Sequence, residues 1–108
     1  MELHHKHLLF DFYGVLLTQH QQDCFTLFYS DDHSLSEIAE ELDITPQAVS
    51  DMLKRTLKKL EQFEAKLGLV QRYTKQQEAA QTMRRLVTQV LQPLRGDILT
   101  QLDVIIKS

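Results

Sequence analysis

Basic and amide side chains gather in one stretch of the chain, residues 45–59, at spacings that place them on the outer side of a helix. Glutamine can pair with adenine, and lysine or arginine can pair with guanine or with a phosphate. Such side chains at the start of a helix are typical of a surface that enters the major groove of DNA. The candidate nucleic-acid-binding residues are Gln47, Ser50, Lys54, Arg55, Lys58 and Lys59.

The charge of the chain is divided unevenly along its length. Residues 1–53 contain ten acidic residues and a single base, Lys6, whereas residues 54–85 contain nine bases and three acidic residues. The whole chain of 108 residues carries a net charge of -3, so any binding of nucleic acid must be local. Two interpretations of the basic stretch stay open. It contacts nucleic acid, or it solvates the outer face of a long helix and pairs with the acidic half.

A short helix must precede the basic stretch. Ser34 and Glu37 form an S-x-x-E capping box, in which each side chain satisfies a free N–H group at the start of a helix. The box predicts a helix over Leu35–Leu42. Its buried side is expected to consist of Leu35, Ile38, Ala39 and Leu42.

A long helix follows after a tight turn. Thr45 can cap it, and Pro46 fits the first helical position because the N–H that proline lacks has no partner there. Gly68 is a plausible terminating residue. Asp43 stands where this turn usually has glycine, and aspartate tolerates the left-handed conformation better than most residues. The pattern predicts a helix-turn-helix with its core at about residues 34–60.

Helical spacing of apolar residues extends over the rest of the chain, and strand patterns are almost absent, so the fold class is all-α. A first helix is predicted from about Leu3 to Leu17. Thr18 and Gln21 then form a T-x-x-Q capping box for a helix that should stop near Tyr29.

The C-terminal region is predicted to contain two further helices, because Pro93 and Gly96 interrupt the helical pattern that runs from Val70 to Leu94. The domain organisation is therefore a helix-turn-helix domain over residues 1–68 and a helical extension over residues 69–108. The extension carries more apolar residues than it can bury by itself. It folds back on the first domain or pairs with a second copy, and we expect a homodimer.

For the other reactive residues, we expect no catalytic or metal-binding role. His4, His5 and His7 lack a further ligand for a metal site, so a solvated terminus is expected and no metal or cofactor is predicted. Cys24 lies among apolar neighbours and is expected to be buried. No catalytic motif, membrane span or signal peptide is found, which favours a cytoplasmic protein that is not an enzyme.

The segment from Leu8 to Leu69 resembles the YlxM-like family of small bacterial helix-turn-helix proteins. The stretch from Leu17 to Leu60 is also similar to the DNA-reading region 4 of sigma factors, which implies a three-helix, winged-helix-like core. The motifs that carry the resemblance are LFDFY, LLT, LFY followed by DD, SLSEIAEEL, QAV and KRT. By position, Gln47, Ala48 and Val49 match the core of the family's recognition helix.

The resemblance implies a regulatory protein that binds DNA and is linked to the signal recognition particle pathway. Pro46 departs from the family, which commonly has arginine there, and this removes a contact to phosphate or base. Asp51 is repelled by phosphates unless it accepts from a cytosine amine. The alternative hypothesis is an interaction module that docks on a protein or on the RNA of the signal recognition particle and modulates its GTPases.

Overall fold

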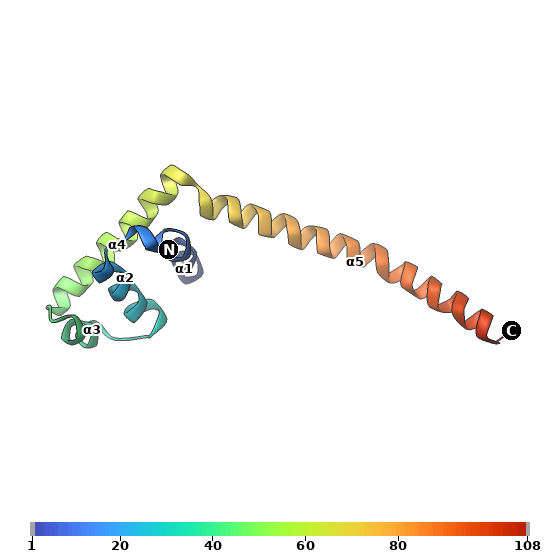
Figure 1. The fold of residues 1–108 in the computed structure, drawn as a ribbon, viewed down its shortest axis with the longest axis horizontal. Coiled ribbons are helices and arrows are strands. Elements are labelled where there is room, and N and C mark those ends of the chain that lie inside the picture. The colour runs from blue at the N-terminus through green and yellow to red at the C-terminus, as the bar shows by residue number, and fades with distance from the viewer. Residues whose placement is uncertain (1, 108) are drawn as a thin grey trace. The chain divides into compact units, whose positions relative to one another are not determined.

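The computed structural model describes residues 2–107, and every element in that range is helical (Figure 1). The all-α class and the helix-turn-helix predicted from the spacing of apolar residues are confirmed. The chain divides into two compact units: unit 1 ends at Gln71, and unit 2 begins at Arg72. Residues 1 and 108, the outer limits of the two predicted regions, lie outside the described residues.

Unit 1 contains four α-helices and two shorter helical turns. Helices α1, α2 and α3 all pack against α4. The elements are α1 (Leu3–Tyr13), the 3₁₀ turn η1 (Gly14–Leu16), α2 (Gln19–Phe25), the π-helical turn η2 (Thr26–Ser30), α3 (Leu35–Leu42) and α4 (Pro46–Leu67).

Capping residues set the starts of three of these helices, as the sequence predicts. The Thr18 and Ser34 side chains each accept from the backbone N–H three residues later, and Gln21 and Glu37 complete the two capping boxes. The hydroxyl of Thr45 accepts from the N–H of Ala48 at 3.1 Å. Each cap satisfies N–H groups that have no partner within the helix.

The first α-helix ends earlier than predicted, whereas the second helical run ends near the predicted residue. Helix α1 ends at Tyr13 rather than near Leu17, because the chain tightens into the 3₁₀ turn, in which the N–H of Leu17 donates to the carbonyl of Gly14 at 3.0 Å. The turn places Leu17 in the core and leaves Val15 84% exposed. Helix α2 passes into the wider π-helical turn η2, which ends at Ser30, next to the predicted stop near Tyr29.

The core of unit 1 consists of two apolar clusters, and α4 contributes to both. Leu60 belongs to the first cluster, with residues of α1 and α2, whereas Val49 and Leu53 belong to the second, with residues of α3. Burial of each such side chain stabilises the fold by about 1.5–3 kcal/mol. One face of α4 is thereby held in the core along most of its length, and its opposite face is fixed toward solvent.

Helix α5 (Leu69–Lys107) is continuous through Pro93, so the predicted separation into two helices is wrong. A proline removes one hydrogen bond, and the carbonyl it leaves free, four residues earlier at Gln89, is on an exposed helix where water can bind it. Gly96 has nothing near it that would force a break. None of the helices between Glu2 and Lys107 has the length and apolarity to cross a bilayer.

Candidate nucleic-acid interface

The turn between α3 and α4 places the start of α4 at the surface. Asp43 adopts the left-handed conformation, with φ 57° and ψ 47°, as expected for a residue in the place of glycine. The N–H of Ile44 then reaches back to the carbonyl of Ala39 at 3.0 Å and closes α3. Val49 and Ala39 are both buried, so α4 packs on α3 through small and branched side chains.

The predicted binding residues lie on the solvent face of α4. With 3.6 residues per turn, Gln47, Lys54 and Lys58 fall on one line along the helix, opposite the buried Val49 and Leu60. All three members of this line are exposed. The line would present one amide and two cations to a partner along three turns.

The other predicted residues flank this line. Arg55 is exposed, whereas Ser50 and Lys59 are half-buried at the two edges of the solvent face. Arg55 also lines a hollow of about 280 Å³ with Met52 and three residues at the start of α2. These three residues are Thr18, His20 and Gln21. Sequence reasoning missed this extension of the surface, because residues 18–21 are far from α4 along the chain.

The glutamine at the start of α4 is held by a neighbour on the same helix. Nε2 of Gln47 donates to Oδ1 of Asp51 at 3.2 Å, over one helical turn. An amide has two N–H donors and one carbonyl acceptor, so one donor and the acceptor stay available. That remaining pair is what a bidentate contact to adenine requires.

The cations of α4 have no acidic partner among the residues that the structure describes. Among residues 2–107, the ion pairs within 4.0 Å join His33 to Glu41 and Lys107 to Asp103. The interpretation that the bases of α4 pair with the acidic N-terminal half therefore finds no ion pair to support it. Their charges are open to a partner from outside.

Acidic residues lie close to this basic face along the chain. Glu40, Glu41 and Asp43 are exposed on α3 and in the turn, and Asp51 is half-buried on α4 itself. Carboxylates near a phosphate backbone weaken binding. The cations are thus confined to the third and later turns of α4, beyond the acidic residues.

A partly buried hydrogen-bond network fixes the other end of α4. The Tyr13 hydroxyl donates to Oε1 of Glu64 at 2.6 Å and accepts from the N–H of Leu69 at 3.0 Å. The Glu64 carboxylate also accepts from the N–H groups of Val70 at 2.9 Å and Gln71 at 3.1 Å. We call Tyr13, Glu64 and these three N–H groups the α4–α5 junction. It satisfies N–H groups at the start of α5 that would otherwise lack partners.

The junction shifts the pKa values of both side chains. Burial alone raises the pKa of Glu64, but the hydrogen bonds from Tyr13 and from the backbone outweigh it, so the pKa is lowered. Burial and the nearby carboxylate raise the pKa of Tyr13. Sequence reasoning missed this network because its two side chains are 51 positions apart.

The remaining reactive groups are placed as follows. Cys24 is fully buried, as expected, and burial raises the pKa of its thiol, which disfavours the reactive thiolate. Between Glu2 and Lys107, no three His, Cys, Asp or Glu side chains are grouped so that they could hold a metal ion. The solvent face of α4 is therefore the strongest candidate site.

Comparison with known proteins finds matches to one helix-turn-helix family. A family model described as "Putative helix-turn-helix protein, YlxM / p13 like" (UPF0122) matches residues 2–95. A UPF0122 protein of Exiguobacterium sp. is 48% identical over 79 residues, which cover 73% of this chain and 74% of that protein. UPF0122 proteins of Bacillus cereus and Bacillus anthracis are 47% identical over 81 residues, which cover 75% of this chain and 74% of each relative.

Proposed function

This chain belongs to the YlxM/p13-like helix-turn-helix family, and from that premise we propose that it is a cytoplasmic regulatory protein that binds DNA through the solvent face of α4. The family is described as one of helix-turn-helix proteins, so the proposed activity is binding. In this proposal, Gln47 and Ser50 face the bases, and Lys54, Arg55, Lys58 and Lys59 face the phosphates.

The observation that carries the proposal is the set of cations on α4 without an acidic partner in the described chain. A helix face held toward solvent by two buried clusters on its other side is rigid before binding, so little ordering is needed. Cations on such a face release counterions when they meet phosphates, which favours association at low salt.

A salt titration tests the proposal. Binding of a labelled DNA duplex of mixed sequence is followed by fluorescence anisotropy at increasing salt concentration. We expect the affinity to fall steeply, and we expect Lys54→Glu and Lys58→Glu each to reduce the slope of log affinity against log salt by about 1. Lys75→Glu, which reverses an exposed charge on α5, is the control and should change the slope less. A salt slope that these variants leave unchanged would contradict the proposal.

Base reading requires a separate variant. Gln47→Ala removes the amide but no charge, so it should leave the salt slope unchanged and weaken the preference for one sequence over another. Selection of bound duplexes from a random pool, with the native protein and with Gln47→Ala, measures that preference. Equal enrichment of all sequences by the native protein would exclude base reading and leave backbone binding alone.

A second function is favoured by the acidic residues beside the site. Glu40, Glu41, Asp43 and Asp51 would oppose a long duplex more than a compact partner that contacts only the later turns of α4. The corresponding proposal is a docking module for a protein or the RNA of the signal recognition particle, modulating its GTPases. Crosslinking in the native cell, followed by identification of the captured RNA, DNA and protein, separates the two. Discrete chromosomal segments support the first function, and particle components without such segments support the second.

A further inference from the structure

Helix α5 presents a continuous row of apolar side chains to solvent. With 3.6 residues per turn, the row occupies roughly a third of the helix circumference, the width that a helix buries against a neighbour. From Met83 onward each member is 48% to 69% exposed. We call the row the α5 stripe; its members are Ala80, Met83, Val87, Val90, Leu91, Leu94, Ile98, Leu102 and Ile105.

A helix of this kind needs a covering partner. Most of the stability of helices in proteins comes from packing of an apolar face, and α5 is 39 residues long. Pro93 inside it costs about 3 kcal/mol relative to alanine. A large exposed apolar face also marks an interaction surface. A membrane surface fits less well, because helices that bind membranes carry many cations on the polar face. Residues 80–107, which span the row, contain four bases and two acidic residues.

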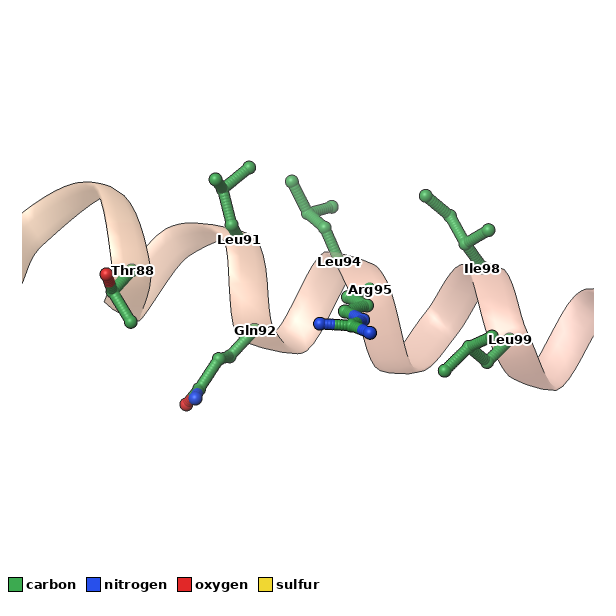
Figure 2. Close-up of a pocket in the computed structure, with 7 residues that line it drawn as sticks. All are labelled: Thr88, Leu91, Gln92, Leu94, Arg95, Ile98 and Leu99. Carbon is green, nitrogen blue, oxygen red and sulfur yellow. The ribbon is translucent and has the colours of Figure 1, made fainter.

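The side chains of the α5 stripe form ridges and hollows like those at helix–helix interfaces. Leu91, Leu94 and Ile98 project from one side of the helix in Figure 2. They line a hollow of about 540 Å³ that extends over one flank of the helix, where Arg95, Thr88, Gln92 and Leu99 line it as well. Leu91, Leu94, Arg95 and Ile98 stand at positions i, i+3, i+4 and i+7, the set that receives one side chain of a packed helix. A second hollow, of about 240 Å³, lies among Leu86, Val87, Val90 and Leu91. Each hollow is lined by residues of α5 alone and is therefore open on its other sides. Such a shallow hollow can receive a side chain of a second helix, but it cannot enclose a small molecule.

Charges beside the stripe favour a second copy of the same helix. Arg95 lies on one flank of the stripe and Asp97 on the opposite flank, two residues further along. In a parallel two-fold pair, each flank faces the opposite flank of the other helix. Arg95 of each copy would then lie opposite Asp97 of the other, twice in the pair. In an antiparallel pair equal flanks meet, so Arg95 and Asp97 would lie on different sides of the pair and could not face each other.

We propose that residues 83–105 of α5 pair in parallel with the same residues of a second copy, so that the protein is a two-fold symmetric dimer. Each layer of the pair places identical apolar side chains across the axis, such as Val87 on Val87 and Leu94 on Leu94. The proposal concerns α5 alone and does not rest on the function proposed for α4.

Cysteine crosslinking of the full chain tests the arrangement. Val87→Cys and Leu94→Cys are made singly, and native Cys24 stays because it is fully buried. In a parallel pair both variants form a disulfide-linked dimer on mild oxidation. In an antiparallel pair the two-fold axis crosses at one level, so at most one of two positions about 10 Å apart along the helix can link to itself. Gln89→Cys, on the far side of α5, is the control and should remain unlinked.

Light scattering at micromolar concentration measures the dimer itself. We expect a mass of twice 12.6 kDa for the native chain and a monomer for the double variant Leu94→Asp, Ile98→Asp. Gln89→Asp and Gln92→Asp together are the matched control and should remain dimeric. A monomeric native chain would overturn the proposal, and so would crosslinking at only one of the two test positions.

Discussion

Unit 1 and helix α5 contain apolar residues at the same helical spacing, but they bury very different shares of them. Leu9, Phe25 and Leu60 in unit 1 are 0% exposed, whereas Leu94 and Ile98 in α5 are 50% and 61% exposed. In unit 1 the apolar face of each helix is covered by neighbouring helices of the same unit. Among the described residues of α5, the apolar face stays exposed. Periodicity predicts that a face will be covered, and it leaves open by what.

The largest expected contrast is between a buried and an exposed apolar side chain of unit 1. Phe25 stacks on Phe10 with ring centroids 4.4 Å apart and contacts Tyr29 as well. Phe25→Ala should lower the free energy of unfolding by about 3–5 kcal/mol, because it removes a ring and leaves a cavity. Val15→Ala, at a side chain that is 84% exposed, should change it by less than about 0.5 kcal/mol. Urea unfolding followed by circular dichroism measures both, and similar losses would contradict the assigned core.

The second contrast concerns the α4–α5 junction and its contribution to stability. Glu64→Ala should lower the free energy of unfolding by about 1–3 kcal/mol, because the Tyr13 hydroxyl and two backbone N–H groups lose their acceptor. Glu61→Ala, at an exposed glutamate on the same helix, is the matched control and should be nearly neutral. Hydrogen exchange should show faster exchange at Val70 and Gln71 in Glu64→Ala alone. Equal effects of both variants would mean that the network stabilises nothing.

The same junction gives a pH dependence with a defined sign. The pKa of Glu64 is lower in the folded protein than its ordinary value of 4.5, so the charged form is stabilised by folding. That stability is fully present above pH 4.5 and is lost as the pH falls through the folded pKa. The advantage of the native chain over Glu64→Gln should therefore shrink on acidification below that pH. Thermal unfolding of both proteins across the range measures the difference, and a constant difference would contradict the assignment.

The fold was predictable where its cause is local. The caps at Thr18, Ser34 and Thr45, the left-handed Asp43 and the stop at Gly68 each depend on residues within a few positions, and the structure confirms them. The path of the chain at Pro93 was predicted wrongly, because a proline weakens a helix without always ending it.

Some features of the candidate site also depend only on local sequence, and others depend on the packing of distant segments. The cations of α4 follow from helical spacing, so sequence alone placed them on one solvent face. The hydrogen bond from Gln47 to Asp51 spans one helical turn and was within reach of the same reasoning. The hollow beside Arg55 and the contact of Tyr13 with Glu64 depend on how distant segments pack. No local pattern encodes either of them.

The smallest expected effects come from one chemical change made in both units. Gly68 ends α4 with φ +64°, a conformation that costs other residues about 1–2 kcal/mol, so Gly68→Ala should destabilise unit 1. Gly96 lies inside α5 with open space where a Cβ would be, and alanine is favoured over glycine in a helix by about 0.5–1 kcal/mol. Gly96→Ala should therefore raise the helix content and slow amide exchange in α5. If both variants changed stability in the same direction, the two glycines could not occupy the different backbone conformations that distinguish a helix end from a helix interior.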